Sequence, residues 1–581
     1  MHKIHYNEGK RKLGDFMKKK WEFYDTDEEL VQKLSQELKV SSILITILMN
    51  RKITDPEKIR IFLNPTRKDF YNPFLLNDME IAVERILKAI EQKEKVLIYG
   101  DYDADGITSI TVLKKFLEER GLTADYYIPN RLEEGYGLNK NAIEKIAKQK
   151  YSLMITVDCG ISAIEEIKLA NNLGIETIIT DHHETVETLP EAMAVVDPKR
   201  KDNTYPFRDL AGVGVVYKLI QALSIRLDLD EKEFLKYLDI VCIGTISDIV
   251  PLVDENRVIA KLGLKLIERT KNKGLKKLID SCNYTSIDAN MISFGVAPRI
   301  NACGRMGFQE EAIRLFLSND EDEVTQITKK LNEYNKERQD TEKKIFEEAI
   351  SKIQEEKMQE NSCIILGGEN WHHGVIGIVS SKITDMYFKP SLLICFEGDM
   401  GKGSGRSIPG FDLHHALMET GSYLERFGGH SMAVGLSVKK EKFEEFKKKF
   451  EELAKESNIQ DILPILYIDE EITIKEMTLE LMHELKQLEP FGEKNKEPLF
   501  MLRNVKIDSI RTLSEGKHMK LTLKEGIYLT ECIGFNLGHL AEDYRIGDKV
   551  DVVGNLAENH YQNLTKVQMI LQDIRKAYKN G

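Results

Sequence analysis

The sequence predicts an α/β protein with several domains: a parallel-sheet domain, a long spacer helix, a second α/β domain and a C-terminal β-barrel. Three observations favour this fold class. Helix and strand patterns alternate between residues 80 and 196, a helical pattern continues for about 35 residues up to residue 355, and short alternating strands occupy residues 464–575. The chain has 581 residues, which at roughly 150 residues per domain is enough for about four domains.

Residues 1–75 predict short helices separated by turn signals such as Asn64-Pro65 and Asn72-Pro73. We interpret this stretch as an N-terminal cap rather than a domain.

The parallel-sheet domain is expected over residues 76–255. An amphipathic helix pattern runs from Met79 to Lys93, and the apolar run KVLIY from Lys95 to Tyr99 predicts a buried strand. The same patterns predict helices at 107–120, 140–149 and 162–172 and strands at 124–128, 152–157, 175–179 and 192–196. Alternation at this spacing is typical of a parallel sheet with helices on both faces.

Residues 256–358 predict a helical connector that ends in the spacer helix. Its heptad-like face recurs at steps of three and four residues: Val324, Ile327, Leu331, Tyr334, Arg338, Thr341 and Ile345. Over about 35 residues this face spans ~50 Å of helix, and it carries too few apolar residues for a strong coiled coil.

Two further domains follow the spacer helix. Residues 359–457 predict a second α/β domain that opens with the strand SCIILGG. Residues 458–581 predict a small β-barrel, because short strands such as HMKLTL and KVDVVGNL alternate with polar turns.

The net charge of −12 and the isoelectric point near 5.7 exclude a protein that coats nucleic acid through a bulk basic surface. Any nucleic-acid binding must therefore depend on a local groove or on metal ions. We expect a basic inner groove and an acidic outer surface.

Three features indicate a cytoplasmic protein without membrane association. The longest apolar run, SSILITILM at 41–49, is far shorter than the ~20 residues of a membrane span. The N-terminus has no apolar region typical of a signal peptide. The 7 cysteines are scattered and include no C-x-x-C pair, which disfavours a disulfide framework and a zinc ribbon.

Acidic and histidine residues follow three strands of the predicted parallel sheet. The first strand leads into Asp101, Asp103 and Asp105, the second into Asp158, and the third into Asp181-His182-His183. Because ligands bind outside the carboxyl ends of parallel strands, we expect these loops to converge in one crevice, within reach of Asp248.

So many carboxylates in one crevice would repel one another unless cations neutralise them. Carboxylates together with imidazoles suit Mn²⁺ or Mg²⁺, and two ions that share a carboxylate can clamp a phosphate for in-line attack. A single acid after a strand is usually a helix cap. A calcium loop starting at Asp101 is excluded, because Val112 stands where its twelfth-position acid is required.

The motifs GDYDADG, VDCG, TDHH and SDIVPL, in this order and spacing, resemble the four motifs of the DHH phosphoesterase family. The similarity is greatest to its bacterial exonucleases specific for single-stranded DNA. The segments WHHGVIGIVSSK, GSGRSI and ERFGGHSMAVGL resemble the DHH-associated domain. The resemblance covers nearly the whole chain and implies a DHH domain at 76–255, a DHH-associated substrate-binding domain at 359–457 and an OB-fold nucleic-acid-binding domain at 458–581.

Matched position by position, the resemblance implies two Mn²⁺ or Mg²⁺ ions, with Asp158 as their bridging ligand. The remaining implied ligands are Asp103 on one ion and Asp105, His182 and Asp248 on the other. His183 would lie beside the reacting phosphate, and Asp181 would orient an imidazole. Another branch of the family has a metal-binding histidine where this chain has Tyr99, so Asp101 or water would take that place.

Several residues in glycine-rich segments are candidates for binding substrate phosphate, because a guanidinium and the backbone can approach a phosphate closely there. They are Arg131, Arg305, Ser404, Arg406 and His430, with Arg299 as a weaker candidate. For any one exposed arginine, the alternative is a solvated surface charge. On the barrel, Phe500, Tyr528, Phe535 and Tyr561 are expected to stack with bases.

The resemblance implies a metal-dependent 5′→3′ exonuclease that degrades single-stranded DNA to mononucleotides in DNA repair and recombination. A related enzyme acting on short oligonucleotides and a non-catalytic DNA-binding scaffold are the alternatives. The extra barrel and cap disfavour the first, and the retained ligand positions disfavour the second. A single-strand-binding protein and a helicase are the expected partners, and the chain is expected to be a monomer.

Overall fold

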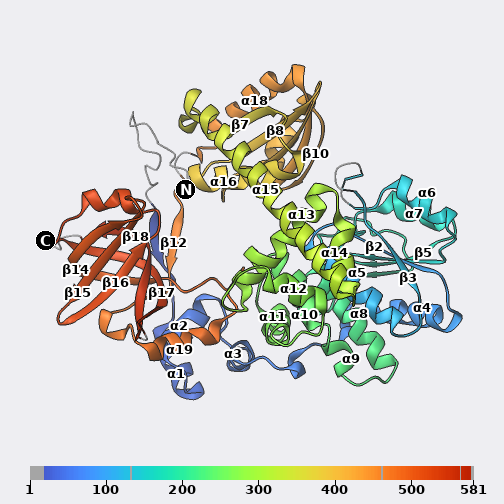
Figure 1. The fold of residues 1–581 in the computed structure, drawn as a ribbon, viewed down its shortest axis with the longest axis horizontal. Coiled ribbons are helices and arrows are strands. Elements are labelled where there is room, and N and C mark those ends of the chain that lie inside the picture. The colour runs from blue at the N-terminus through green and yellow to red at the C-terminus, as the bar shows by residue number, and fades with distance from the viewer. Residues whose placement is uncertain (1–18, 131–133, 136, 460–461, 563, 578–581) are drawn as a thin grey trace.

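The computed structural model describes residues 19–130, 134–135, 137–459, 462–562 and 564–577. The candidate Arg131 therefore lies outside the described residues. Figure 1 shows the first α/β domain and its helices at the right, the second α/β domain at the top and the barrel at the left.

The first sheet has five parallel strands in the order β3-β2-β4-β5-β6. These strands are β2 (Val96–Gly100), β3 (Ala124–Tyr127), β4 (Leu153–Val157), β5 (Glu176–Thr180) and β6 (Ala194–Val196). The accompanying helices are α4 (Met79–Gln92), α5 (Ala104–Glu118), α6 (Lys140–Lys148), α7 (Ile164–Asn172) and α8 (Gly212–Arg226). Residues of α4, α5 and α8 form one apolar core and residues of α6 and α7 another, which confirms the predicted α/β class.

Helix α5 begins three residues earlier than the sequence pattern predicts. Asp103 is its N-cap, and its carboxylate accepts hydrogen bonds from the backbone N–H groups of Asp105 and Gly106. Asp105 therefore lies in the first turn of a helix and not in a loop.

The helical connector packs beside this sheet. Its helices are α9 (Lys232–Leu235), α10 (Leu238–Ser247), α11 (Asp254–Ile267), α12 (Lys273–Asp280), α13 (Ala297–Met306) and α14 (Gln309–Leu317). The spacer helix α15 (Glu321–Glu355) has 35 residues. Leu331 in its first half belongs to the core of the first domain, and Ile345 in its second half belongs to a core of the second domain. The helix thus joins the two lobes (Figure 1).

The second α/β domain has a mixed sheet in the order β10-β11-β9-β8-β7. Its strands are β7 (Ile364–Glu369), β8 (Ser391–Glu397), β9 (Met400–Arg406), β10 (Leu424–His430) and β11 (Ala433–Lys439). Only β7 and β8 are parallel. Its helices are α16 (His373–Tyr387), α17 (Leu413–Glu419) and α18 (Phe443–Glu456).

The C-terminal domain is the predicted barrel. It comprises β14 (Phe500–Leu513), β15 (His518–Glu525), β16 (Tyr528–Gly534), β17 (Lys549–Tyr561) and β18 (Leu564–Lys576). The additional pairing of β14 with β17 closes it. Helices α1 (Glu28–Leu38), α2 (Ser42–Asn50) and α3 (Pro56–Leu63) share its apolar core with α19 (Leu479–Leu485). A short ribbon pairs β1 (Lys20–Phe23) with β12 (Ile465–Ile468), and β13 (Glu470–Glu471) pairs with β14.

A buried arginine ties the barrel to the first domain. Arg257 of α11 is 1% exposed and donates hydrogen bonds to the backbone carbonyls of Phe62, Gln487, Leu488 and Glu489 at 2.6–2.9 Å. Carbonyl partners of this kind offset the cost of burying a guanidinium. Within the described part of the chain, no helix has the length and apolar character needed to cross a membrane.

Candidate metal centre

Asp105 is held rigidly at the carboxyl edge of the first sheet. Its carboxylate is 1% exposed and accepts hydrogen bonds at 2.7 Å from the backbone N–H groups of Gly212 and Val213, at the start of α8. The positive end of that helix stabilises the carboxylate. The turn before Asp105 requires glycine at 106, because a Cβ there would lie 2.4 Å from the carbonyl oxygen of Asp101.

Asp158 follows β4 directly and is 3% exposed. Its φ of 59° lies in the left-handed region, which aspartate tolerates better than most residues. A Cβ at Gly212 would lie 2.7 Å from the Asp158 carboxylate. A glycine at the start of α8 is therefore what lets this helix approach Asp158.

The three consecutive residues Asp181, His182 and His183 have different surroundings. His182 Nε2 lies 3.1 Å from Asp158 Oδ1, 3.6 Å from Asp248 Oδ2 and 3.8 Å from Asp105 Oδ2. Asp181 accepts hydrogen bonds from the backbone N–H of Ile161 and of His182, and His183 Nδ1 lies 2.7 Å from its carboxylate. Asp181 thus holds the loop and one imidazole.

The potential ligand atoms form three groups, and within each group they lie within 4.8 Å of one another. The groups are Asp101–Asp103–Asp158, Asp105–His182–Asp248 and Asp158–His182–His183. Asp158 belongs to two of them, with Asp101 and Asp103 in one and with His182 and His183 in the other. We call these seven residues the acidic cluster.

Burial and like charges raise the pKa values of the carboxyl groups in this cluster. Burial and then Asp103 raise the pKa of Asp105 to about 7, and burial and then Asp105 raise the pKa of Asp248 to about 9. Burial and then Asp105 also raise the pKa of Asp158 well above its usual range. Cations in the cluster would offset these repulsions.

At neutral pH one of the two imidazoles is neutral and the other is positively charged. Burial and the neighbouring His183 lower the pKa of His182 to about 3, so His182 is neutral. For His183, burial lowers the pKa, but the hydrogen bond with Asp181 outweighs burial and raises the value to about 9. His182 Nε2 is buried, faces three carboxylates and makes no hydrogen bond. A neutral nitrogen among carboxylate oxygens fits a divalent cation.

Two residues at this edge were missed by sequence reasoning. Asp197 follows β6, is fully buried, and has its pKa raised to about 8 by burial and by Asp181. Asp197 directly follows a predicted strand, as other acids of the site do, and this position could have identified it from the sequence. Asn301 of α13 accepts a hydrogen bond of 2.8 Å from the backbone N–H of Ala104. From the sequence, only Arg299 and Arg305 are candidates in this helix.

The structure places the arginine candidates differently from one another. Arg299 donates hydrogen bonds to Asn332 and to the Gly295 carbonyl, so it connects α13 to α15. Arg305 donates to the Gly374 carbonyl at the start of α16 and so links the first lobe to the second.

The other candidates lie on the sheet of the second domain. Arg406, at the end of β9, donates hydrogen bonds to Ser404 Oγ and to the Gly405 carbonyl. A Cβ at Gly377 of α16 would lie 2.9 Å from Ser404 Oγ and 3.4 Å from the Arg406 guanidinium. His430 is exposed at the end of β10, and β11 separates β10 from β9.

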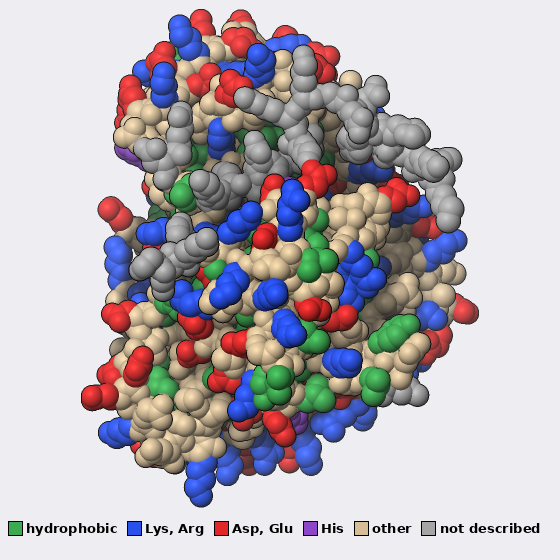
Figure 2. Space-filling view, turned by 90° about the vertical axis from the view of Figure 1, so that its left-hand side faces the viewer, with side chains coloured by type: hydrophobic (Ala, Val, Ile, Leu, Met, Phe, Trp, Pro, Cys, Tyr) green, Lys and Arg blue, Asp and Glu red, His purple; other side chains and the backbone are tan. Residues whose placement is uncertain are grey.

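Three of the four aromatic side chains expected to stack with bases are exposed on the barrel. Tyr528, Phe535 and Tyr561 are 42%, 54% and 68% exposed, but Phe500 is fully buried, so the prediction for Phe500 was wrong. Phe500 begins β14 with its side chain in the barrel core. Figure 2 shows Lys and Arg side chains interspersed with acidic and hydrophobic ones on the face of the molecule that includes the barrel.

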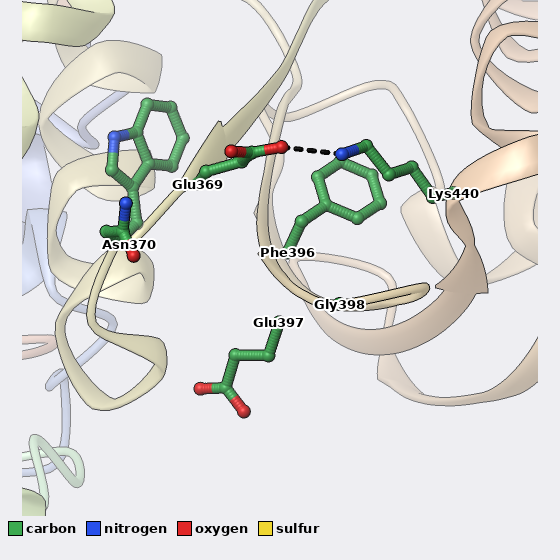
Figure 3. A pocket seen from close by; sticks show the side chains of 7 residues that line it. Glu369, Asn370, Phe396, Glu397, Gly398 and Lys440 are labelled. Atoms are coloured by element: carbon green, nitrogen blue, oxygen red, sulfur yellow. Dashed lines mark hydrogen bonds and ion pairs between the residues drawn. The ribbon is translucent and has the colours of Figure 1, made fainter.

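A separate cavity of about 340 Å³ opens in the second domain (Figure 3). Phe396, Glu397 and Gly398 line it, and Glu369 and Lys440 form an ion pair of 2.5 Å beside them. None of its lining residues belongs to the acidic cluster or to the candidate phosphate contacts.

Comparison with protein families finds three matching domain models. The DHH family N-terminal domain matches residues 95–245, the DHHA1 domain matches residues 360–456, and the RecJ OB domain matches residues 468–573.

Curated relatives and solved structures match over most of the chain. The single-stranded-DNA-specific exonuclease RecJ of Bacillus subtilis is 38% identical over 96% of this chain and 71% of its own length. The Escherichia coli exonuclease of the same name is 31% identical over 86% of this chain and 90% of its own length. The crystal structure of Thermus thermophilus RecJ in complex with Mn²⁺ superposes with a TM-score of 0.84, at 29% identity, over 96% of this chain and 80% of that one. The same protein in complex with Mg²⁺ gives a TM-score of 0.79 at 28% identity.

Proposed function

The chain belongs to the RecJ family of single-stranded-DNA-specific exonucleases, and we propose on this premise that it hydrolyses single-stranded DNA from the 5′ end and releases mononucleotides. The observation that carries the proposal is the acidic cluster, in which two groups of ligand atoms share Asp158. A scaffold that only binds DNA gains nothing from so many mutually repelling carboxylates.

The cluster suits two Mn²⁺ or Mg²⁺ ions. Asp103 and Asp158, with Asp101, would hold one ion, and Asp105, His182 and Asp248, with Asp158, would hold the other. When bound, such ions activate water and stabilise the charge that develops on a phosphate. His182 fits a ligand role because its imidazole is neutral and its buried Nε2 makes no hydrogen bond within the protein.

The remaining groups position the substrate. His183 is protonated and is held by Asp181, so it supplies a fixed positive charge beside the cluster for the phosphate oxygens. Arg406, Ser404 and His430 supply donors on the second domain, and Arg305 supplies one from α13 of the first lobe, which suits a 5′-phosphate. Exposed Tyr528 and Tyr561 on the barrel would stack with the bases that follow.

We further propose that the enzyme acts in DNA repair and recombination as a cytoplasmic monomer, together with a helicase and a single-strand-binding protein. These partners would supply and protect the single-stranded DNA that the enzyme hydrolyses.

The test uses one DNA sequence in four forms: single-stranded with a 5′ label, single-stranded with a 3′ label, with a 5′ overhang, and as a blunt duplex. With Mn²⁺ we expect mononucleotides from the labelled 5′ end first, and digestion of the single strand and the overhang but little of the duplex. No hydrolysis without added cations is expected. Release from the 3′ end first, equal digestion of blunt duplex, or DNA binding without hydrolysis would each contradict the proposal.

A further inference from the structure

Ile249 combines two unusual features next to the acidic cluster. Its φ is 59°, in the left-handed region that β-branched residues strongly avoid. Its side chain is 73% exposed. Among the described residues it is the only β-branched one with a left-handed φ. Strain of this kind persists where the surrounding structure imposes it and is concentrated at functional sites.

The backbone around Ile249 explains how the strain is imposed. Helix α10 ends at Ser247, and the N–H groups of Asp248 and Ile249 donate to the carbonyls of Gly244 and Ile246. Three residues later, the N–H of Leu252 donates to the carbonyl of Glu493 at 2.9 Å. The chain must therefore turn sharply at Ile249. Glycine or asparagine would make this turn at lower cost, so the turn alone does not account for isoleucine.

The position of Ile249 beside the acidic cluster explains why an isoleucine stands at this turn. It directly follows Asp248, whose carboxylate lies 3.6 Å from His182 Nε2, and consecutive Cα atoms are only 3.8 Å apart. An exposed aliphatic side chain is thus held at the rim of a site made of carboxylates and imidazoles. A ligand that covers this side chain would remove its apolar surface from water and so bind more tightly.

We propose that Ile249 is a substrate-positioning and specificity residue, which packs against the deoxyribose of the nucleotide whose phosphate lies at the acidic cluster. The inference rests on the proposed function. The sugar is the group bonded directly to the phosphate, and C2′ of deoxyribose is an apolar methylene. A ribose carries a hydroxyl at that carbon, and isoleucine cannot form a hydrogen bond with it. Ile249 therefore favours DNA over RNA.

The test replaces Ile249 with asparagine and, separately, with glycine, since both tolerate the left-handed turn. We expect a melting temperature equal to or above the parent's, and unchanged Mn²⁺ affinity by calorimetry. We expect KM for single-stranded DNA to rise about tenfold, the equivalent of losing one to two buried methylenes. The preference for DNA over the same strand with a 5′-terminal ribonucleotide, measured as kcat/KM, should fall by a similar factor.

Ile225→Asn is the matched control. Ile225 is 51% exposed near the far end of α8, about 20 Å from the Gly212 end of the helix that touches Asp158. It should leave KM and the sugar preference unchanged. If the Ile249 variants keep the parent's KM, lose Mn²⁺ affinity or unfold, the proposed role is wrong. If KM rises without a change in sugar preference, the sugar contact is wrong. A parent protein that does not hydrolyse DNA at all would instead contradict the proposed function.

Discussion

At the scale of single residues, Asp158 has the most demanding position. Its backbone adopts a left-handed φ of 59°, and its buried carboxylate is grouped both with Asp101 and Asp103 and with His182 and His183. Burial and the neighbouring carboxylates raise its pKa, which means that the ionised form is costly without cations. The ionised Asp158 carboxylate therefore destabilises the metal-free protein, and bound cations would offset this loss of stability.

Asp158→Asn should therefore separate stability from activity. Asparagine keeps the backbone conformation and removes one charge from the repelling group. We expect the metal-free protein to melt at a higher temperature, while DNA hydrolysis falls by about a thousandfold because the shared ligand is lost. Asp228→Asn is the control, since Asp228 is exposed and also has a left-handed φ of 49°. Near-parental hydrolysis by a folded Asp158→Asn protein would refute the bridging assignment.

At the scale of elements, helix α13 connects the acidic cluster to the second domain. Asn301 accepts a hydrogen bond from Ala104 at the start of α5. One turn later, a Cβ at Gly304 would lie 2.4 Å from the carbonyl oxygen of Tyr102. Arg305 then donates a hydrogen bond to the Gly374 carbonyl of the facing domain. One rigid helix thus touches the loop that carries Asp103 and also the lobe that carries Arg406.

Asn301→Leu should displace this loop. The Ala104 N–H would lose its partner, at a cost of about 1–3 kcal/mol, and misplaced ligands should lower kcat by about 100-fold and weaken Mn²⁺ binding measured by calorimetry. Asn272→Leu is a fair comparison, because Asn272 caps α12 by the same kind of hydrogen bond, to Leu275 N–H. It should lower the melting temperature without changing Mn²⁺ affinity. Equal Mn²⁺ affinity in both variants would remove α13 from the site.

At the scale of the whole molecule, the acidic cluster should make stability depend on pH and on cations. The pKa values of Asp105 and Asp248 are raised to about 7 and about 9, above the value of about 4 in an unfolded chain. The folded protein therefore binds more protons than the unfolded one, and its stability falls as pH rises from about 4 to about 9.

Thermal unfolding of the metal-free protein between pH 6 and pH 8.5 should show this decline. Added Mg²⁺ should raise the melting temperature, and by more at pH 8.5 than at pH 6, because a cation offsets the repulsion between ionised carboxylates. Asp248→Asn should flatten the dependence. A melting temperature of the metal-free protein that rises over this pH range would contradict the assigned ionisation states.

Local patterns were sufficient to predict the main elements. Apolar runs that alternate with helix patterns predicted the five parallel strands, and the period of the face from Val324 to Ile345 predicted α15. The start of α5 was misplaced because an N-cap depends on one side chain, Asp103, and not on periodicity. Phe500 was misassigned because its aromatic ring fits a stacking platform as well as a barrel core, and only the closure of β14 onto β17 buries it.

The sequence by itself determined the order of the domains and the residues at the strand ends, because strand patterns are local. Ligands bind outside the carboxyl ends of parallel strands, so these patterns also indicated where the site lies. Only the tertiary structure decided which side chains meet. Gly212 approaches Asp158 across 54 positions of sequence, and Asn301 reaches Ala104 from α13. The left-handed turn at Ile249 likewise follows from the contact between Leu252 and Glu493, which lie far apart in the chain. Such contacts depend on how helices pack on a closed core, and no local pattern encodes that packing.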